Sequence, residues 1–187
     1  MKIGIIQASS QIEKNTILYE CTKDYGEVIN FGCFEDEENY SYVEIALEIC
    51  LLISSQAVDF IVTGCSSGQG MMIACNSLPN LICGYLPTPQ DAYLFGRIND
   101  GNVASLPLGL NYGWAGEINL KTTLQQLFEE PFGIGYPLKD AKRKIEDTKK
   151  IKVLNKLCKK DIIEFLDEID DQLIIKVLSK KNVIDYI

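Results

Sequence analysis

Apolar residues along the chain alternate between short continuous runs and longer stretches that carry a single apolar stripe. The short runs are rich in Ile and Val and are bounded by turn residues, which is typical of buried strands. Five runs are predicted as strands: Lys2–Gln7, Glu27–Phe31, Val58–Val62, Leu81–Gly84 and Val103–Leu106. Between them the apolar positions follow helical spacing. The clearest helical stripe is Val43, Ala46, Leu47, Cys50 and Leu51.

This alternation of strands and helices predicts the fold class. Crossover connections of this kind give a three-layer α/β/α sandwich with a five-stranded parallel, Rossmann-like sheet. Ligands of such sheets bind at the carboxyl ends of the strands, where the strand order switches. We expect the loops at 7–10, 64–70, 85–90 and 98–102 to lie on that edge.

The last part of the chain differs in composition. Gly133–Pro137 ends the α/β pattern, so residues 1–138 are predicted as one domain and residues 139–187 as a helical extension. The first part carries a net charge of −11 and the second a net charge of +3. The apolar spacing of the extension predicts two or three short amphipathic helices, which are too small to fold alone. We expect them to dock on the domain or on a partner subunit.

The segment Thr63–Met72 carries the candidate chemistry. It places Cys65 at the end of the third strand and a loop of small residues before a short helix. Such a loop leaves backbone N–H groups free at the helix start, where they favour an anion or a developing oxyanion. The same position favours thiolate over thiol, so Cys65 is a candidate base. The alternative interpretation is a simple strand–helix turn with a buried cysteine.

The amino-acid composition limits which groups could carry out this chemistry. The chain contains no histidine, so any proton transfer must use Cys, Asp, Glu, Lys or Tyr. The seven cysteines are single and form no C-x-x-C pair, which argues against a zinc site and a disulfide framework. We expect no metal and no cofactor. The loop also lacks a Walker lysine and G-x-G-x-x-G spacing, which argues against a nucleotide site.

Charge and hydropathy limit the partners. The net charge of −8 argues against nucleic acid. No apolar run approaches the roughly 20 residues of a membrane span. The amino-terminal apolar stretch turns polar at Gln7, too early for a signal peptide. We therefore expect a cytoplasmic protein that does not bind membranes.

Two motifs resemble the type B ribose-5-phosphate isomerases and galactose-6-phosphate isomerases. Cys65–Gly70, followed by Ile73-Ala74 and Asn76, is similar to the family segment C-G-T-G-x-G…I-A-x-N. Asn99-Asp100-x-Asn102-Val103 is similar to H-N-D-x-N-V. The match covers about residues 1–130.

A longer branch of this family, the ribose/galactose isomerases with a C-terminal helical extension, resembles the chain further. The similar segments are Gly68-Gln69-Gly70, Asn76-Ser77-x-Pro79, Cys83-Gly84-Tyr85, Asp91–Phe95, Ser105-Leu106-Pro107, Gly113-Trp114, Glu117-x-Asn119-Leu120 and Gly135-Tyr136-Pro137.

The resemblance implies an aldose–ketose isomerase of a pentose- or hexose-class sugar or sugar phosphate, working through an enediolate without a metal. It implies a homodimer with active sites between subunits, and a tetramer stays open. Cys65 matches the base, Ser67 the threonine near it, and Asn99 a substrate-binding asparagine. The rest of the loop matches the residues that bind the enediolate oxygen, namely Ser66, Gly68, Gln69 and Gly70.

The chain also departs from the family. Ile98 stands where the family has a ring-opening histidine, and Ala8-Ser9 or Ser9-Ser10 replaces an Asp-His pair. The phosphate-binding arginines have no clear counterpart, since the chain has only Arg97 and Arg143. Ser9 and Arg97 stay candidate substrate-binding residues. The alternatives are that Ser9 and Ser10 cap the first helix and that Arg97 lies at the surface.

These departures predict a different sugar, unphosphorylated or open-chain, or else a poor isomerase. They argue against ribose 5-phosphate itself as the substrate. The alternative function is a non-catalytic sugar-binding or regulatory protein on the isomerase scaffold. Trp114 and Tyr85 are expected either to line the site or to pack in the core.

Overall fold

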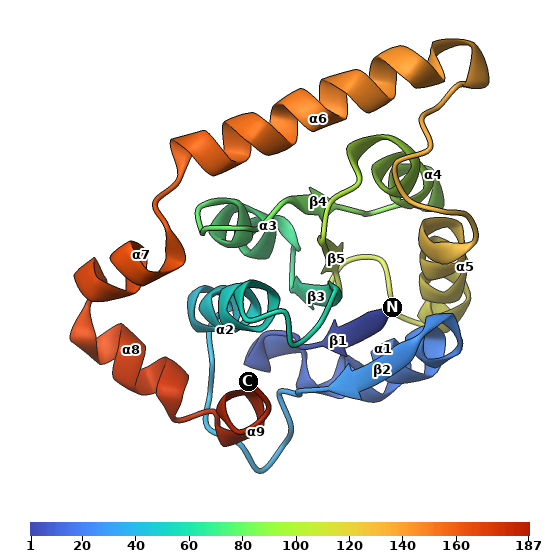
Figure 1. The fold of residues 1–187 in the computed structure, drawn as a ribbon. Helices are drawn as coiled ribbons and strands as arrows, with labels where there is room; N and C mark the ends of the chain where they lie inside the picture. The colour runs from blue at the N-terminus through green and yellow to red at the C-terminus, as the bar shows by residue number, and fades with distance from the viewer.

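The computed structural model describes residues 1–187 and is built around one parallel β-sheet (Figure 1). The strands are β1 (Lys2–Ile5), β2 (Glu27–Asn30), β3 (Phe60–Cys65), β4 (Cys83–Tyr85) and β5 (Val103–Pro107). Every neighbouring pair is parallel, in the order β2-β1-β3-β5-β4. The chain starts in the middle of the sheet, so the direction of strand addition reverses between β1 and β3.

Helices cover both faces of the sheet. Figure 1 shows α2 and α3 on one face and α1, α4 and α5 on the other. The helical elements of this part are η1 (Ser9–Lys14), α1 (Asn15–Thr22), η2 (Lys23–Tyr25), α2 (Tyr42–Ser54), α3 (Gln69–Asn76), α4 (Pro89–Leu94), η3 (Phe95–Asn99) and α5 (Gly116–Phe128). The three-layer α/β/α fold predicted from the sequence is confirmed.

Strand side chains alternate between the two apolar cores, as the pleat of a strand requires. In β3, Ile61 packs in the core under α2 and α3, whereas Phe60 and Val62 pack in the core under α1, α4 and α5. Both faces of β3 are buried along its whole length. A central strand of this kind gives its last residue, Cys65, a rigid position.

Helix α2 begins at a capping box that fixes the preceding loop. Ser41 Oγ accepts a hydrogen bond from the Val43 N–H, and the Glu44 carboxylate accepts one from the Ser41 N–H. Both contacts satisfy donors that a helix start would otherwise leave unpaired. The cap therefore sets where the segment between β2 and α2 ends.

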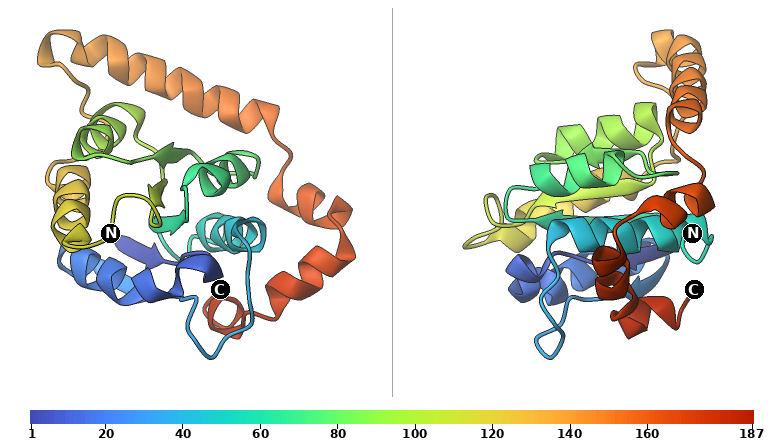
Figure 2. Two further views of the ribbon diagram at one scale, coloured as in Figure 1. Left: turned by 180° about the vertical axis from the view of Figure 1, so that it is seen from behind. Right: turned by 90° about the vertical axis from the view of Figure 1, so that its left-hand side faces the viewer.

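The C-terminal extension runs along the side of the α2/α3 layer, from the β4 edge towards β2 (Figure 2). Its elements are η4 (Leu138–Asp140), α6 (Ala141–Cys158), α7 (Ile162–Glu168), α8 (Asp171–Leu178) and α9 (Lys181–Ile184). Helix α6 has 18 residues, so the prediction of two or three short helices is wrong in both number and length. No helix is long and apolar enough to span a membrane.

The two ends of the extension are attached differently. Near the end of α6, Lys159 Nζ donates to the carbonyl oxygens of Leu78 and Leu81, at 2.7 and 2.9 Å. Further on, Val177 and Val183 are buried in the same core as α2. The extension is therefore held by polar contacts near α6, and by both apolar packing and polar contacts around α8 and α9.

Candidate active site

A cavity of about 470 Å³ opens at the carboxyl ends of β1 and β3. Its lining comes from three segments: Ala8, Ser9 and Ser10 after β1, Asn39–Tyr42 before α2, and Cys65 at the end of β3. This is the point at which the strand order reverses. Sheets of this kind bind small ligands at such a point.

Cys65 lines this cavity, although only 7% of the residue is exposed. The backbone holds it from both sides, because the Ala8 N–H donates to the Gly64 carbonyl and the Leu108 N–H donates to the Cys65 carbonyl, both at 3.0 Å. The alternative of a buried cysteine holds in part, because Cys65 packs in the core under α2 and α3, but the residue also lines the cavity. The sulfur belongs to a residue that shares a cavity with three serines and two tyrosines.

Three further buried cysteines, Cys33, Cys50 and Cys83, do not line this cavity. Burial raises the pKa of Cys33, raises that of Cys50 to about 11, and raises that of Cys83 well above its usual value. They therefore stay protonated as thiols near neutral pH, and all three pack in the core under α2 and α3. No three Cys, Asp or Glu side chains are arranged to hold a metal ion.

The loop after β3 is held in shape by β5 and by the segment that follows β5. Gly68 has φ +73°, and a Cβ there would lie 2.9 Å from the Leu106 carbonyl oxygen. Ser105 Oγ donates to the Gly68 carbonyl at 2.7 Å, and the Gly109 N–H donates to the Ser66 carbonyl at 2.9 Å. Only glycine fits the left-handed, crowded position at Gly68 without strain.

These contacts use the carbonyl groups of the loop and leave its N–H groups free. The N–H groups of Ser66, Ser67, Gly68 and Gly70 donate no hydrogen bond within the chain, and that of Gln69 meets only Ser67 Oγ, at 3.4 Å. Helix α3 starts at Gln69, so its dipole adds partial positive charge here. Such a set of preorganised donors can stabilise an oxyanion.

Gln11 joins the loops that follow β1 and β3, and the sequence pattern gave no sign of it. Its Nε2 donates to Ser66 Oγ at 3.0 Å and to the Ser10 carbonyl at 2.6 Å. Its Oε1 is buried without a hydrogen-bond partner. The helical spacing of apolar residues in 11–25 predicts a helix start, but it does not indicate which groups the Gln11 side chain contacts.

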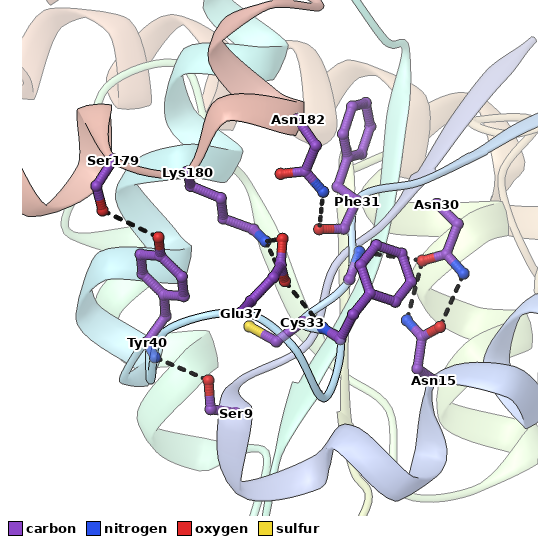
Figure 3. Close-up of polar contacts among 12 residues, drawn as sticks. Ser9, Asn15, Asn30, Phe31, Cys33, Glu37, Tyr40, Ser179, Lys180 and Asn182 are labelled. Carbon is purple, nitrogen blue, oxygen red and sulfur yellow. Dashed lines mark hydrogen bonds and ion pairs between the residues drawn. The ribbon is translucent and has the colours of Figure 1, made fainter.

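Ser9 lies in the cavity lining, but the predicted helix cap is wrong. Helix η1 begins with no side-chain cap. Instead, Ser9 Oγ accepts a hydrogen bond from the Tyr40 N–H at 2.7 Å, and the Ser9 N–H donates to the Tyr40 carbonyl at 3.0 Å (Figure 3). Ser9 therefore ties the loop after β1 to the segment before α2.

Asn99 does not meet Cys65 within one chain. It ends η3 and precedes β5, so it lies at the amino edge of the sheet, whereas Cys65 lies at the carboxyl edge. The expectation that the 98–102 loop lies on the carboxyl edge is wrong, because this loop enters a strand rather than leaving one. Asn99 is exposed there.

Arg97 is a core residue, and neither prediction for it holds. It is 0% exposed, and its Nη2 donates to the Leu127 carbonyl at 2.6 Å. Its guanidinium lies 5.4 Å from the ring centroids of both Tyr93 and Phe132, which is the geometry of cation–π contacts. The side chain supports α4 and α5 and reaches no cavity at the carboxyl edge.

The segment before α2 is the part of the site that the sequence analysis misses. Asn39, Tyr40 and Tyr42 line the cavity, and a Cβ on Gly70 would lie 3.4 Å from the Tyr42 ring. This segment follows β2, so the rule that selected the other carboxyl-edge loops also selects it. The acidic composition of residues 35–38 is typical of a surface loop and does not indicate a site. Trp114, by contrast, is fully exposed, at 101%, and packs in no core.

The fold and cavity define a Rossmann-like α/β/α protein with a small-molecule site at its switch point. A family model described as Ribose/Galactose Isomerase matches residues 3–132. The chain belongs to this family, and it is a sugar isomerase acting on a small-molecule sugar. A search among curated proteins finds no match.

Solved structures extend the likeness to the C-terminal extension. A 4-deoxy-L-threo-5-hexosulose-uronate ketol-isomerase complexed with a tartrate is 36% identical, with a TM-score of 0.94, over 100% of this chain and 91% of that one. Ribose-5-phosphate isomerase LacAB_rpiB from Vibrio parahaemolyticus is 32% identical, with a TM-score of 0.93 and the same coverage. The type B ribose 5-phosphate isomerase from Trypanosoma cruzi shares the fold, at 20% identity and a TM-score of 0.69, over 83% of this chain and 98% of that one.

Proposed function

We propose that the chain interconverts an aldose and a ketose through an enediolate, with Cys65 as the base. The observation that carries this proposal is the position of Cys65. It lines a cavity at the switch point, directly before a loop whose N–H groups are free. A base and an oxyanion site beside each other are the two parts that proton transfer next to a carbonyl requires.

Each part has a separate role in the reaction. The Cys65 thiolate removes a proton from the carbon next to the carbonyl and returns it to the neighbouring carbon. Negative charge then collects on oxygen, where each preorganised loop N–H contributes about 3–4 kcal/mol. Ser67, half-buried in the same loop, supplies a hydroxyl for the substrate oxygens. Ser66, Gly68, Gln69 and Gly70 bind the substrate through this loop.

For the substrate, we infer an open-chain sugar or sugar acid. Ile98 cannot open a sugar ring by acid–base chemistry, and the chain has no histidine to replace it. Arg97 is buried in the core, and Arg143 lies on α6 in an ion pair with Asp147. No arginine therefore lines the cavity to hold a phosphate. The 36% identical relative is named for a uronate, which is a sugar acid.

We further infer a homodimer in which Asn99 completes the site of the partner subunit. Within one chain, Asn99 and Cys65 lie on opposite edges of the sheet. Asn99 can therefore contact a substrate at Cys65 only from a second copy. The exposure of Asn99 allows that contact.

A substrate panel in deuterated water tests this function. We expect open-chain keto and aldo sugars and sugar acids to be isomerised with solvent deuterium entering at the carbon next to the carbonyl, detected by NMR. For substrates that also form rings, kcat/KM should rise with the open-chain fraction. Thermal stabilisation by these compounds without any conversion or exchange would contradict the proposal.

A further inference from the structure

The C-terminal extension makes an ion pair with the segment between β2 and α2, in which the lysine side chain is fully buried and the glutamate side chain is 20% exposed. Lys180 is 1% exposed, and its Nζ lies 2.7 Å from both carboxylate oxygens of Glu37. Figure 3 shows the two side chains pointing at each other, that of Lys180 from directly before α9 and that of Glu37 from this segment. The Glu37 carboxylate also accepts a hydrogen bond from the Phe34 N–H at 2.8 Å, so the pair fixes the local backbone.

Further contacts from the extension reach the same segment. Tyr40 Oη and Ser179 Oγ are 3.0 Å apart, and the Lys180 and Lys176 ammonium groups lie 5.1 and 4.6 Å from the Tyr40 ring centroid. Asn182 Nδ2 donates to the Phe31 carbonyl at 2.9 Å. The end of the chain therefore holds both ends of residues 31–40.

This segment is also a wall of the candidate active site. Asn39 and Tyr40 line the cavity with Cys65. Tyr40 exchanges two hydrogen bonds with Ser9, at 2.7 and 3.0 Å, and Ser9 lines the same cavity. A continuous path of polar contacts therefore runs from Lys180 through the segment to the cavity.

Burial makes the Lys180–Glu37 pair different from the other ion pairs of the extension. A buried charge is tolerated only when it is paired, so removing one partner destabilises the arrangement around the other. The pair between Lys160 and Glu168 is about half exposed, and such pairs contribute little. The position of the 31–40 segment is thus tied to Lys180 more firmly than to any exposed contact.

We propose that Lys180 is a positioning residue of the active site. Through Glu37 and Tyr40, it holds residues 31–40 as a wall of the cavity at Cys65. It does not touch the substrate itself. This inference rests on the proposed function of Cys65, and it assigns the C-terminal extension a part in substrate binding.

The test compares three full-length variants. Lys180→Met removes the charge at similar length, Lys180→Arg keeps it, and Lys160→Met removes the exposed pair as a matched control. We expect Lys180→Met to raise KM about tenfold or more with kcat nearly unchanged, which is the range for residues that orient a site indirectly. Lys180→Arg should restore most of the affinity, and Lys160→Met should behave as the wild type.

Hydrogen exchange without substrate provides an independent readout. In Lys180→Met, the amides of residues 33–42 and Ser9 should exchange at least about tenfold faster, since their hydrogen bonds open more often. A loss of folded protein alone would lower the apparent kcat and leave KM unchanged. If Lys180→Met does not fold, Glu37→Gln combined with Lys180→Met removes both charges and should show the same two effects.

Wild-type KM and wild-type exchange in a folded Lys180→Met or double variant would overturn the inference. Failure of the proposed function would give a different experimental result. In that case Cys65→Ala would keep full turnover, whatever the exchange rates of the Lys180 variants.

Discussion

Glu48 on α2 is the most unusual buried side chain of the domain. It is 0% exposed, and neither carboxylate oxygen has a hydrogen-bond partner. Burial raises its pKa from 4.5 to about 8, the charge of Lys180 opposes the shift, and Glu37 adds to it. In the folded state the carboxyl therefore stays protonated at neutral pH, whereas in the unfolded state it ionises. The contribution of Glu48 to stability therefore falls as pH rises from about 4.5 through 8.

We expect Glu48→Gln to remove this pH dependence, because an amide does not ionise. As pH rises across this range, the wild type should lose stability relative to the variant, by on the order of a few kcal/mol in unfolding free energy. Urea unfolding at several pH values measures the shift. Glu117→Gln, an exposed glutamate on α5, is the control and should follow the wild type. Parallel curves for Glu48→Gln and wild type would refute this assignment.

At the scale of elements, the loop between β3 and α3 combines a fixed shape with free donors. Gly68 adopts φ +73° against the Leu106 carbonyl, and Ser105 holds its carbonyl from β5. A side chain at position 68 must move the loop away from β5. The N–H groups proposed to bind the enediolate oxygen would then lose their positions.

We therefore expect Gly68→Ala to destabilise the fold by about 1–3 kcal/mol and to lower kcat more strongly than KM changes. Gly113→Ala is the matched control, because a Cβ there meets nothing within 4 Å and φ is not in the left-handed range. Thermal unfolding and steady-state kinetics give both quantities. Full activity of Gly68→Ala would show that the loop N–H groups do not stabilise the transition state.

Hydrophobic periodicity was sufficient to predict the strands and helices of the α/β domain. It was not sufficient to predict where every loop lies or which charged side chains are buried. The five strands and the α2 stripe could be predicted, since burial on both faces or on one face leaves a clear pattern. The edge on which 98–102 lies depends on chain direction, and the prediction ignored it. The burial of Arg97 and Glu48 could not be predicted, because charged residues are seldom fully buried.

For the candidate site, the Cys65–Gly70 motif was visible in the sequence, whereas the contacts around it were not. Tyr40 lines the cavity and Gln11 contacts Ser66 next to Cys65, through hydrogen bonds that have no periodic signature. The polar contacts that attach the extension also have no periodic signature. An example is the hydrogen bond that Lys159 Nζ donates to the Leu78 carbonyl. These contacts require the folded chain.

At the scale of the whole molecule, the docking of the extension and the formation of a dimer both bear on the active site. The division at residue 138 stays a prediction, and we propose that the extension docks on its own domain, because Val177 and Val183 share the core of α2. The separation of Asn99 from Cys65 by the length of the strands is the reason for the proposed dimer. Both proposals make the active site a property of the assembled molecule rather than of the 66–70 loop alone.

Mixing two inactive variants tests the shared site. Cys65→Ala and Asn99→Ala should each be nearly inactive, but a dimer with one chain of each contains one intact pair of Cys65 and Asn99. After refolding together in equal amounts, we expect recovery of up to about a quarter of the wild-type activity. Mixing two preparations of Cys65→Ala is the control and should recover none. No recovery from mixed dimers of confirmed composition would place Asn99 outside the partner's site.

The most direct measurement of the central claim is the rate at which solvent deuterium enters the carbon next to the substrate carbonyl, followed by NMR for wild type, Cys65→Ala and Cys75→Ala. Cys75 is a fully buried cysteine on α3 that does not line the cavity, so its replacement controls for the loss of a sulfur atom. The account predicts that Cys65→Ala stays folded, still binds the sugar and loses the exchange by at least about a hundredfold, while Cys75→Ala retains it. Exchange at the wild-type rate in folded Cys65→Ala would show that another group moves the proton.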